Sequence, residues 1–330
     1  MPLIKILAER ELREVVGLDR DIVDCIESAF ATLAGGAVVM PPILSMGIAD
    51  FHGEIDVKTA YVPGVESFAV KVSPGFFDNP KIGLPTTSGL MILFSSRTGV
   101  LEAVLLENGY LTDIRTAAAG AVAARCLSRE DAASACILGA GAQAKLQLQA
   151  LSLVRPIRNA TIWARDTDKS AAAAAEMEKT MGIPVASASD PEAAVSSADI
   201  IVTTTAAKAP VLMADWMRSG QHITAMGSDQ GDKNELDPGC FLKATLYAPD
   251  RLSQTEILGE LRSAIEAGVV SPGTDFAELG DIVAGNVPGR KHPEDITICD
   301  LTGTGMQDTA IATLARERAI AAGAGLDFKT

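Results

Sequence analysis

The sequence predicts an α/β protein in which a doubly wound parallel sheet is joined to a second, α+β domain with an antiparallel sheet. Three observations predict it. Residues 133–138 form a short apolar run that leads directly into a glycine-rich turn. From residue 130 to 300, strand-like apolar runs alternate with helical segments, which implies parallel strands and crossover helices. Before residue 120, apolar and polar residues alternate in period two between short turns, which favours antiparallel strands.

The elements of the first domain follow from these patterns. An acidic amphipathic helix precedes four strands, and turns at 77–80 and 97–99 separate strands from one another. A helix rich in small residues then leads into the second domain. We expect the helix at 19–33, the strands at 54–61, 67–73, 89–95 and 100–106, and the second helix at 113–126. A C-terminal helix at 305–322 is expected to return to this domain, so the predicted domains are 1–120 completed by 305–330, and 121–304.

The second domain alternates strands and helices more regularly. Its expected strands are 133–138, 160–165, 199–205, 221–227, 245–248 and 296–299, and its expected helices are 143–153 and 169–181, with a helical turn at 213–218. The stretch 269–292 is rich in glycine and proline and is expected to loop over one face.

Composition restricts the class of protein. The 330 residues are enough for two cores, and no apolar run approaches the roughly 18–20 residues that a membrane span needs. The start of the chain lacks the pattern of a signal peptide, so we expect a cytoplasmic protein. A net charge of −14 without a basic stripe argues against nucleic acid as a partner. Five cysteines without C-x-x-C spacing and three scattered histidines predict no metal site.

The glycine-rich turn is Gly139-x-Gly141, with Ala144 in place of a third glycine. Glycines let the backbone approach a pyrophosphate closely, and the following helix presents its free N–H groups to that anion. The turn therefore predicts a Rossmann-type site for a nicotinamide cofactor. The alternative is a glycine turn without a ligand inside an α/β core.

The residues at the end of the next strand do not decide between NAD and NADP. Arg165 stands where an acidic residue would otherwise bind the ribose 2′-hydroxyl, and it favours a 2′-phosphate. Asp166 beside it would repel that phosphate and could bind hydroxyls instead. We expect NAD or NADP, with NAD slightly favoured.

Charged residues on two strands of the first domain form a candidate site. Asp56 and Lys58 share one face of their strand. In the next strand, 67–73, Lys71 lies on the face opposite the apolar residues Phe68, Val70 and Val72. If these strands pair, a carboxylate and two lysines line one surface. A solvated outer face is the alternative reading.

Three further residues could carry chemistry. Arg115 lies near the start of the helix at 113–126, where the helix dipole disfavours a cation unless an anion accompanies it. Asp229 and Lys233 follow the strand at 221–227, at the edge where ligands bind in open α/β sheets. A turn or capping role for Asp229 is the alternative.

Segments over nearly the whole chain resemble the ornithine cyclodeaminase/mu-crystallin family. They are Lys71 in its strand, 113–118, 139–144, 162–165, Asp229 with Lys233 and Glu235, 276–280 and Asp308. The segments 40–43, 58–64, 74–80, 107–113 and 300–308 resemble the branch of iminosuccinate reductases and ectoine-utilisation cyclodeaminase-like proteins.

The resemblance implies a homodimer with an N-terminal dimerisation and substrate domain and a tightly bound NAD(P). It implies that Asp229 and Lys71 are catalytic, with Asp229 as the acid/base. By position in the family, Lys71 and Arg115 hold the substrate carboxylate, and Asp56 matches a family glutamate. Together with Lys58 and Lys233, Arg115 and Asp56 are the residues that we expect to contact substrate. The residues expected at the cofactor are Arg115, Thr116, Gly139, Gly141, Ala142, Gln143, Arg165, Asp166, Thr204, Thr205, Met226, Gly227, Ser228, Thr302 and Gly303.

Two departures from the family pattern bear on the substrate. Ile43 and Leu44 stand where family members often carry an arginine, and Lys58 occupies a position that is often apolar. An additional lysine would repel the side-chain ammonium of ornithine and suit a second carboxylate. We therefore expect a reductase of iminosuccinate, a small dicarboxylate imine, that forms L-aspartate. An ornithine cyclodeaminase-type lyase and a crystallin-like NADP-dependent ketimine reductase or binding protein are the alternatives.

Overall fold

The computed structural model describes residues 3–329, and these residues form two compact units. Unit 1 holds the chain up to Arg115 and again from Thr304 onward, and unit 2 holds Thr116–Gly303. The change from unit 1 to unit 2 falls inside helix α3 (Tyr110–Leu127), where the sequence analysis placed a domain boundary at 120/121. No helix between residues 3 and 329 combines the length and apolarity needed to cross a bilayer.

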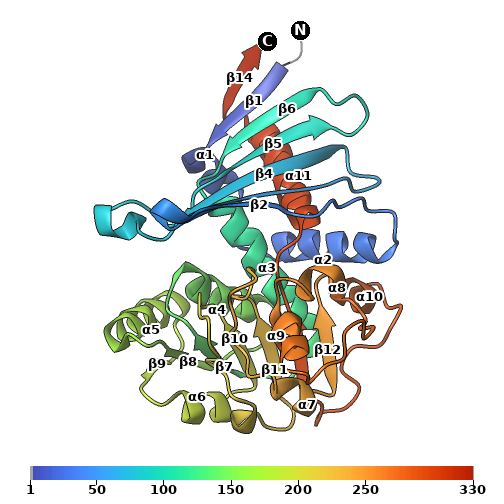
Figure 1. Ribbon diagram of the computed structural model, residues 1–330. Coiled ribbons are helices and arrows are strands. Elements are labelled where there is room, and N and C mark those ends of the chain that lie inside the picture. Colours follow the sequence, from blue (N-terminus) through green and yellow to red (C-terminus); the bar gives the residue numbers. More distant parts are fainter. Residues whose placement is uncertain (1–2, 330) are drawn as a thin grey trace. The chain divides into compact units, whose positions relative to one another are not determined.

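Unit 1 is built on a mixed sheet. Its strands are β1 (Leu3–Ala8), β2 (Leu44–Ile48), β3 (Gly53–Ala60), β4 (Ser67–Phe76), β5 (Leu90–Ser95), β6 (Leu101–Leu106) and β14 (Leu326–Lys329), and its helices are α1 (Glu9–Val15), α2 (Arg20–Ala34) and α11 (Gly305–Ala322). The strand order in this part of the described chain is β14-β1-β6-β5-β4-β3-β2 (Figure 1). The four predicted strands pair antiparallel as expected, whereas β1 pairs parallel with β6.

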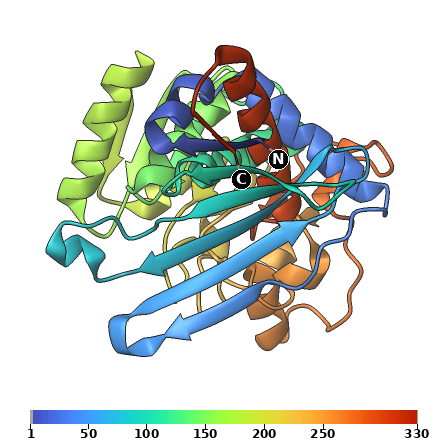
Figure 2. The ribbon, with the colours of Figure 1, turned by 90° about the horizontal axis from the view of Figure 1, so that it is seen from above.

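Helix α11 packs against β3, β4 and β5, and Figure 2 shows it crossing the sheet. The Thr309 hydroxyl donates to the Ala60 carbonyl at 3.0 Å and accepts from the Ala69 N–H at 3.1 Å. Burial along β4 alternates accordingly. Ala69 and Lys71 are buried, whereas Phe68, Val70 and Val72 are half-buried. The lysine-bearing face is therefore the covered face. The alternative reading of that face as a solvated one was wrong, because the returning C-terminal helix covers it.

Unit 2 is a Rossmann-type domain, as predicted. Its strands are β7 (Ser134–Leu138), β8 (Asn159–Trp163), β9 (Val185–Ala188), β10 (Ile200–Thr203), β11 (His222–Ala225), β12 (Leu246–Pro249) and β13 (Thr297–Asp300). Its helices are α4 (Ala142–Val154), α5 (Thr167–Met181), α6 (Pro191–Ser197), α7 (Cys240–Lys243), α8 (Leu252–Thr255), α9 (Glu260–Glu266) and α10 (Leu279–Val283), with a 3₁₀ turn η3 (Ala214–Trp216). The described strands pair parallel in the order β12-β13-β11-β10-β7-β8-β9.

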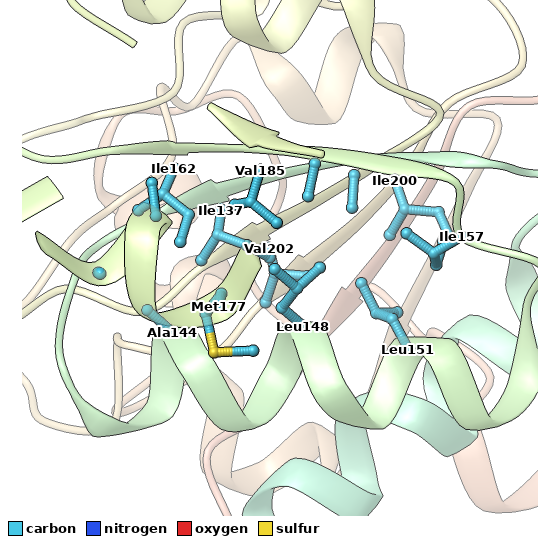
Figure 3. Close-up of a cluster of buried hydrophobic side chains, with 14 of the residues drawn as sticks. Ile137, Ala144, Leu148, Leu151, Ile157, Ile162, Met177, Val185, Ile200 and Val202 are labelled. Atoms are coloured by element: carbon cyan, nitrogen blue, oxygen red, sulfur yellow. The ribbon is translucent and has the colours of Figure 1, made fainter. Parts of the chain in front are cut away.

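Alternate residues of each strand in unit 2 enter two different cores. Ile137 of β7 and Val202 of β10 pack against Leu148 of α4 in the cluster drawn in Figure 3, which also takes in α5. Cys136 and Ile201, one position earlier on the same strands, belong to the second cluster with α6 and α9. Because successive side chains of a strand point to opposite faces, helices cover both faces of the sheet. This is the doubly wound arrangement.

Candidate functional site

The site in unit 1 is a group of buried charges, Lys58, Lys71, Arg115 and Asp308, which we call the cation cluster. Lys58 of β3 and Lys71 of β4 are directly opposite each other across the antiparallel pair. Arg115 lies in the second turn of α3, and Asp308 lies in the first turn of α11. The exposed fraction is 7% for Lys58, 1% for Lys71, 5% for Arg115 and 0% for Asp308. Buried like charges on facing strands repel each other, so this arrangement requires anions nearby.

Asp308 supplies one of those anions. The Lys71 Nζ lies 3.1 Å from each Asp308 carboxylate oxygen, and the Arg115 Nε lies 3.1 Å from Asp308 Oδ1. The Arg115 Nη1 donates to Gln307 Oε1 at 2.9 Å. The Gln307 Nε2 is a buried donor without a hydrogen-bond partner among the described residues. A buried donor of this kind calls for an acceptor from outside the chain, and a substrate carboxylate is one.

The electrostatics of the cluster follow from burial and from its charges. Burial lowers the pKa of Lys71 to about 8, with Asp308 opposing the shift and Arg115 and Lys58 adding to it. Burial alone would raise the pKa of Asp308, but the nearby cations outweigh burial and hold it below its usual range. Lys71 is thus an ammonium poised to release a proton near neutral pH, which suits a general acid.

Two further acids accompany the cluster in unit 1. Asp56 pairs with Ser73 in the β3–β4 register and lies two residues before Lys58, on the same strand face. Glu107 is fully buried, its carboxylate accepts from the Thr112 N–H at 3.1 Å, and burial raises its pKa. The Lys71 ammonium opposes that shift, so Glu107 lies near enough to the cluster to interact with its charges.

The glycine turn of unit 2 has the shape that a pyrophosphate needs. Gly139 has φ 135°, and a Cβ on it would lie 2.3 Å from the Thr204 hydroxyl. A Cβ on Gly141 would meet nothing within 4 Å. Helix α4 starts at Ala142 with no side chain capping its N-terminus, so its first N–H groups are open to an anion. Ala144 is fully buried in the core of Figure 3, where a third glycine would allow the same close packing. These residues fit a dinucleotide.

Gln147, on the next turn of α4, connects two predicted cofactor residues. Its Nε2 donates to the Thr116 carbonyl at 3.0 Å and to Gln143 Oε1 at 3.3 Å. It is fully buried, so these hydrogen bonds hold α3 and α4 in register within unit 2.

Glu235 organises the loops at the carboxyl ends of β10 and β11. Its carboxylate accepts from the Thr203 hydroxyl at 2.6 Å, from the Thr205 hydroxyl at 2.7 Å and from the Gly227 N–H at 2.7 Å. Burial raises its pKa to about 7, and the neighbouring Glu260 adds to the shift. The predicted cofactor residues Thr204, Thr205, Met226, Gly227 and Ser228 lie in the two loops that Glu235 joins.

The loop after β13 is held in the same way. Asp250 accepts from the Thr302 hydroxyl at 2.9 Å and from the Gly303 N–H at 2.7 Å.

Asp229 and Lys233, in the loop after β11, form an ion pair at 2.6 Å with exposed fractions of 45% and 13%. A half-exposed carboxylate that already has a cationic partner fits the turn role for Asp229 as well as a catalytic one.

Some of the predicted site residues lie together in the structure, and some residues of the site were not predicted. The predicted Lys58, Lys71 and Arg115 converge in unit 1, whereas Asp229 and Lys233 belong to unit 2. The helix that carries Arg115 starts at Tyr110, three residues earlier than predicted, so Arg115 is not at the helix N-terminus. Its expected anionic partner is Asp308. The resemblance named Asp308, Glu235 and the segment 107–113, which begins at Glu107, without assigning a role to any of these acids, and no local pattern marks Gln147.

Known proteins resemble the chain along its full length. Residues 5–323 match the model of the ornithine cyclodeaminase/mu-crystallin family. The Rhizobium meliloti protein RB0419 is 59% identical, and an uncharacterized cyclodeaminase of Sinorhizobium fredii, y4tK, is 57% identical. Both alignments cover 100% of this chain and 100% of the relative, and neither name identifies a substrate.

Three solved structures share the fold. A Thermococcus litoralis Δ1-pyrroline-2-carboxylate reductase with NADH and L-proline has a TM-score of 0.93 and 30% identity, covering 98% of this chain and 100% of the other. An archaeal alanine dehydrogenase dimer with NAD has a TM-score of 0.92 and 32% identity, covering 99% of each chain. The Paracoccus denitrificans iminosuccinate reductase with NAD⁺ has a TM-score of 0.91 and 28% identity, covering 99% of this chain and 100% of the other. With the family match, the Rossmann-type unit and the glycine turn, these likenesses lead to one conclusion. The chain belongs to the ornithine cyclodeaminase/mu-crystallin family.

Proposed function

We propose that this protein is an NAD(P)H-dependent imine reductase and that it reduces iminosuccinate to L-aspartate. The observation that carries the proposal is the charge of the cation cluster. Lys58, Lys71 and Arg115 are buried together beside Asp308, and cationic side chains grouped in this way suit a substrate that carries two carboxylates.

The cluster also discriminates among the substrates of related enzymes. A monocarboxylate imine would neutralise less of its positive charge, and the ammonium of ornithine would be repelled by Lys58 and Lys71. The relatives solved with bound ligands act on pyrroline-2-carboxylate and iminosuccinate, as their names state, so both imine classes are known in this fold. Lys58 is the residue that favours the dicarboxylate here.

The reaction adds a hydride to the imine carbon and a proton to the imine nitrogen, and NAD(P)H becomes NAD(P)⁺. When bound at the glycine turn, the cofactor supplies the hydride. Arg115 and Lys58 hold the carboxylates and so orient the imine. Lys71, with its pKa near 8, donates the proton, while Asp229 is the alternative donor or relay.

The test is oxidation of NADH and NADPH, followed at 340 nm, with purified protein and freshly generated iminosuccinate. The comparison substrates are pyruvate with ammonium, Δ1-pyrroline-2-carboxylate and ornithine. Oxidation that is fastest with iminosuccinate and yields aspartate supports the proposal. Ammonia and proline from ornithine without net oxidation would overturn it in favour of a cyclodeaminase, the activity in the name of the Sinorhizobium fredii relative.

A substitution in the cluster tests the substrate separately from the reaction. Lys58→Met removes one charge while keeping an unbranched side chain that can fill the space. We expect kcat/KM for iminosuccinate to fall roughly 30-fold or more, because one carboxylate loses a buried partner. The value for Δ1-pyrroline-2-carboxylate should change much less. Equal losses on both substrates would mean that Lys58 does not select the second carboxylate.

We also propose that the protein is a homodimer that pairs through the outer face of the unit 1 sheet. The face opposite α11 is apolar and half-exposed along β4 and β5, and Phe68 stacks on Phe94 there with ring centroids 5.5 Å apart. Leu44 and Met46 of the edge strand β2 are exposed as well. A continuous apolar sheet face of this kind favours burial against a second copy, and a related alanine dehydrogenase is a dimer.

A further inference from the structure

A cavity of about 650 Å³ in unit 2 has a distinctive lining. Its wall includes Trp163 at the end of β8, Pro191 at the start of α6, Pro210 after β10 and Trp216 of η3. The chain contains two tryptophans, and both line this cavity. Flat aromatic and proline surfaces around a space of this size suit a planar heterocycle such as adenine.

The cavity adjoins the glycine turn. The Gly139 N–H donates to the carbonyl of Trp163 at 2.8 Å, so the turn and the cavity wall are hydrogen-bonded neighbours. Thr204, which faces Gly139, is followed two residues later by the lining residue Ala206. A dinucleotide with its pyrophosphate at the turn therefore has its adenosine within reach of the cavity.

The charges around the cavity are of one sign. Among the described residues that line it, the charged ones are Arg165 and Lys208, and no acid is present. Lys208 forms an exposed ion pair with Asp232 at 2.5 Å, so Arg165 is the stronger candidate for a ligand. A ribose with both hydroxyls free is usually bound by a carboxylate at this strand end, whereas a 2′-phosphate is bound by an arginine.

Asp166 is the acid that could have bound the ribose hydroxyls. In the structure its Oδ1 accepts from the N–H groups of Asp168 and Lys169, each at 3.1 Å, and so caps helix α5. Its other oxygen lies 3.8 Å from the Lys169 Nζ, and Asp166 is not a lining residue. The acid is thus engaged by its own helix, and Arg165 faces the cavity without it.

We propose that Arg165, assisted by Lys208, makes this cavity a site for an adenosine that carries a 2′-phosphate, so that the chain prefers NADP(H) to NAD(H). The proposal rests on the cofactor-dependent function proposed above and adds its cofactor specificity. The overall charge of −14 would repel such an anion, so these local cations are needed to bind it.

The test uses tryptophan fluorescence, because both tryptophans border the proposed site and report on binding without catalysis. The full-length protein is titrated with AMP and with adenosine 2′,5′-bisphosphate, which differ only in the 2′-phosphate, and then with NAD⁺ and NADP⁺. We expect the bisphosphate to bind roughly tenfold to a hundredfold more tightly than AMP, the range for charge-assisted hydrogen bonds.

Arg165→Ala should remove most of that difference by weakening binding of the bisphosphate far more than binding of AMP. Lys208→Ala should remove a smaller part. Lys179→Ala is the control for charge alone, because it removes an exposed cation from the last turn of α5. This variant should prefer the bisphosphate to AMP by the same factor as the unchanged protein.

The possible outcomes separate this inference from the proposed function. Equal affinity for AMP and the bisphosphate, in a protein that still binds NAD⁺ and reduces iminosuccinate, overturns the specificity and leaves the function standing. A preference that Arg165→Ala does not change also overturns it. A preference for the bisphosphate without any imine reduction sustains the cavity assignment and overturns the function instead. No binding of any nucleotide overturns both.

Discussion

Asp308 contacts two cations of the cluster, and its replacement tests how much its charge stabilises them in the buried site. Asp308→Asn keeps the shape of the side chain and removes its charge. Lys71 and Arg115, both almost fully buried, then lose their ionic partner. Removing one partner of a buried ion pair destabilises a protein by about 3–5 kcal/mol, because the remaining charge stays buried without compensation.

The destabilisation should depend on pH in a defined direction. The pKa of Lys71 is about 8 in the folded protein, below its usual value of 10.5. Between these two values the unfolded chain binds more protons, so stability rises with pH in that window. Above pH 8 Lys71 is largely neutral when folded, and its attraction to Asp308 is lost in the unchanged protein too. The difference between the protein and the variant should therefore be largest below pH 8 and shrink as pH rises.

Urea unfolding followed by far-UV circular dichroism measures the free energies, and hydrogen exchange of peptides from β4 and α11 locates the change in unit 1. Both tryptophans lie in unit 2, so their fluorescence is not the reporter for this variant. The matched control is Glu317→Gln on the exposed side of α11, which should shift stability by less than about 0.5 kcal/mol.

A double variant tests the cause. Asp308→Asn with Lys71→Met removes both members of the pair, so its loss should be smaller than the sum of the single losses by about 1–3 kcal/mol. The reasoning is refuted if Asp308→Asn costs under about 1 kcal/mol, or if its cost is the same in the presence and absence of Lys71.

Three other predictions follow from the geometry. If Lys71 donates the proton, the rate of imine reduction falls as pH rises through about 8, and Lys71→Met lowers kcat by roughly 10²–10⁴ and abolishes that inflection. A pH-independent rate in the unchanged protein would exclude this role. Glu235→Gln should weaken NAD(P)H binding roughly tenfold in equilibrium titrations, because one acceptor for the Thr205 and Gly227 loops becomes a donor; unchanged affinity would limit Glu235 to a structural role. Phe68→Glu should convert a dimer into a monomer by light scattering, since it places a charge in the apolar sheet face; a dimer that persists would place the interface elsewhere.

Much of the fold could be predicted from local patterns. The strands β3 to β6 and the strands β7, β8, β10 and β11 were predicted within about three residues, because period-two alternation and short apolar runs are properties of contiguous residues. Helix α11 was predicted with its observed bounds. Strands β1, β2, β9 and β14 were missed, and β14 pairs with β1 from the opposite end of the chain. A pairing between the two termini leaves no local signal.

By itself, the sequence determined a glycine turn between a strand and a helix, because all three are features of contiguous residues. It also predicted that Lys58 and Lys71 line one face of the sheet if their strands pair, and the structure places them directly opposite each other. Only the tertiary structure decided that this face is buried. Asp308 is 237 residues from Lys71, and the two meet because the last long helix returns to the first sheet. Tertiary structure likewise decided that Asp166 caps its own helix while Arg165 borders the cavity, since two adjacent charges can be told apart only by the contacts each one makes.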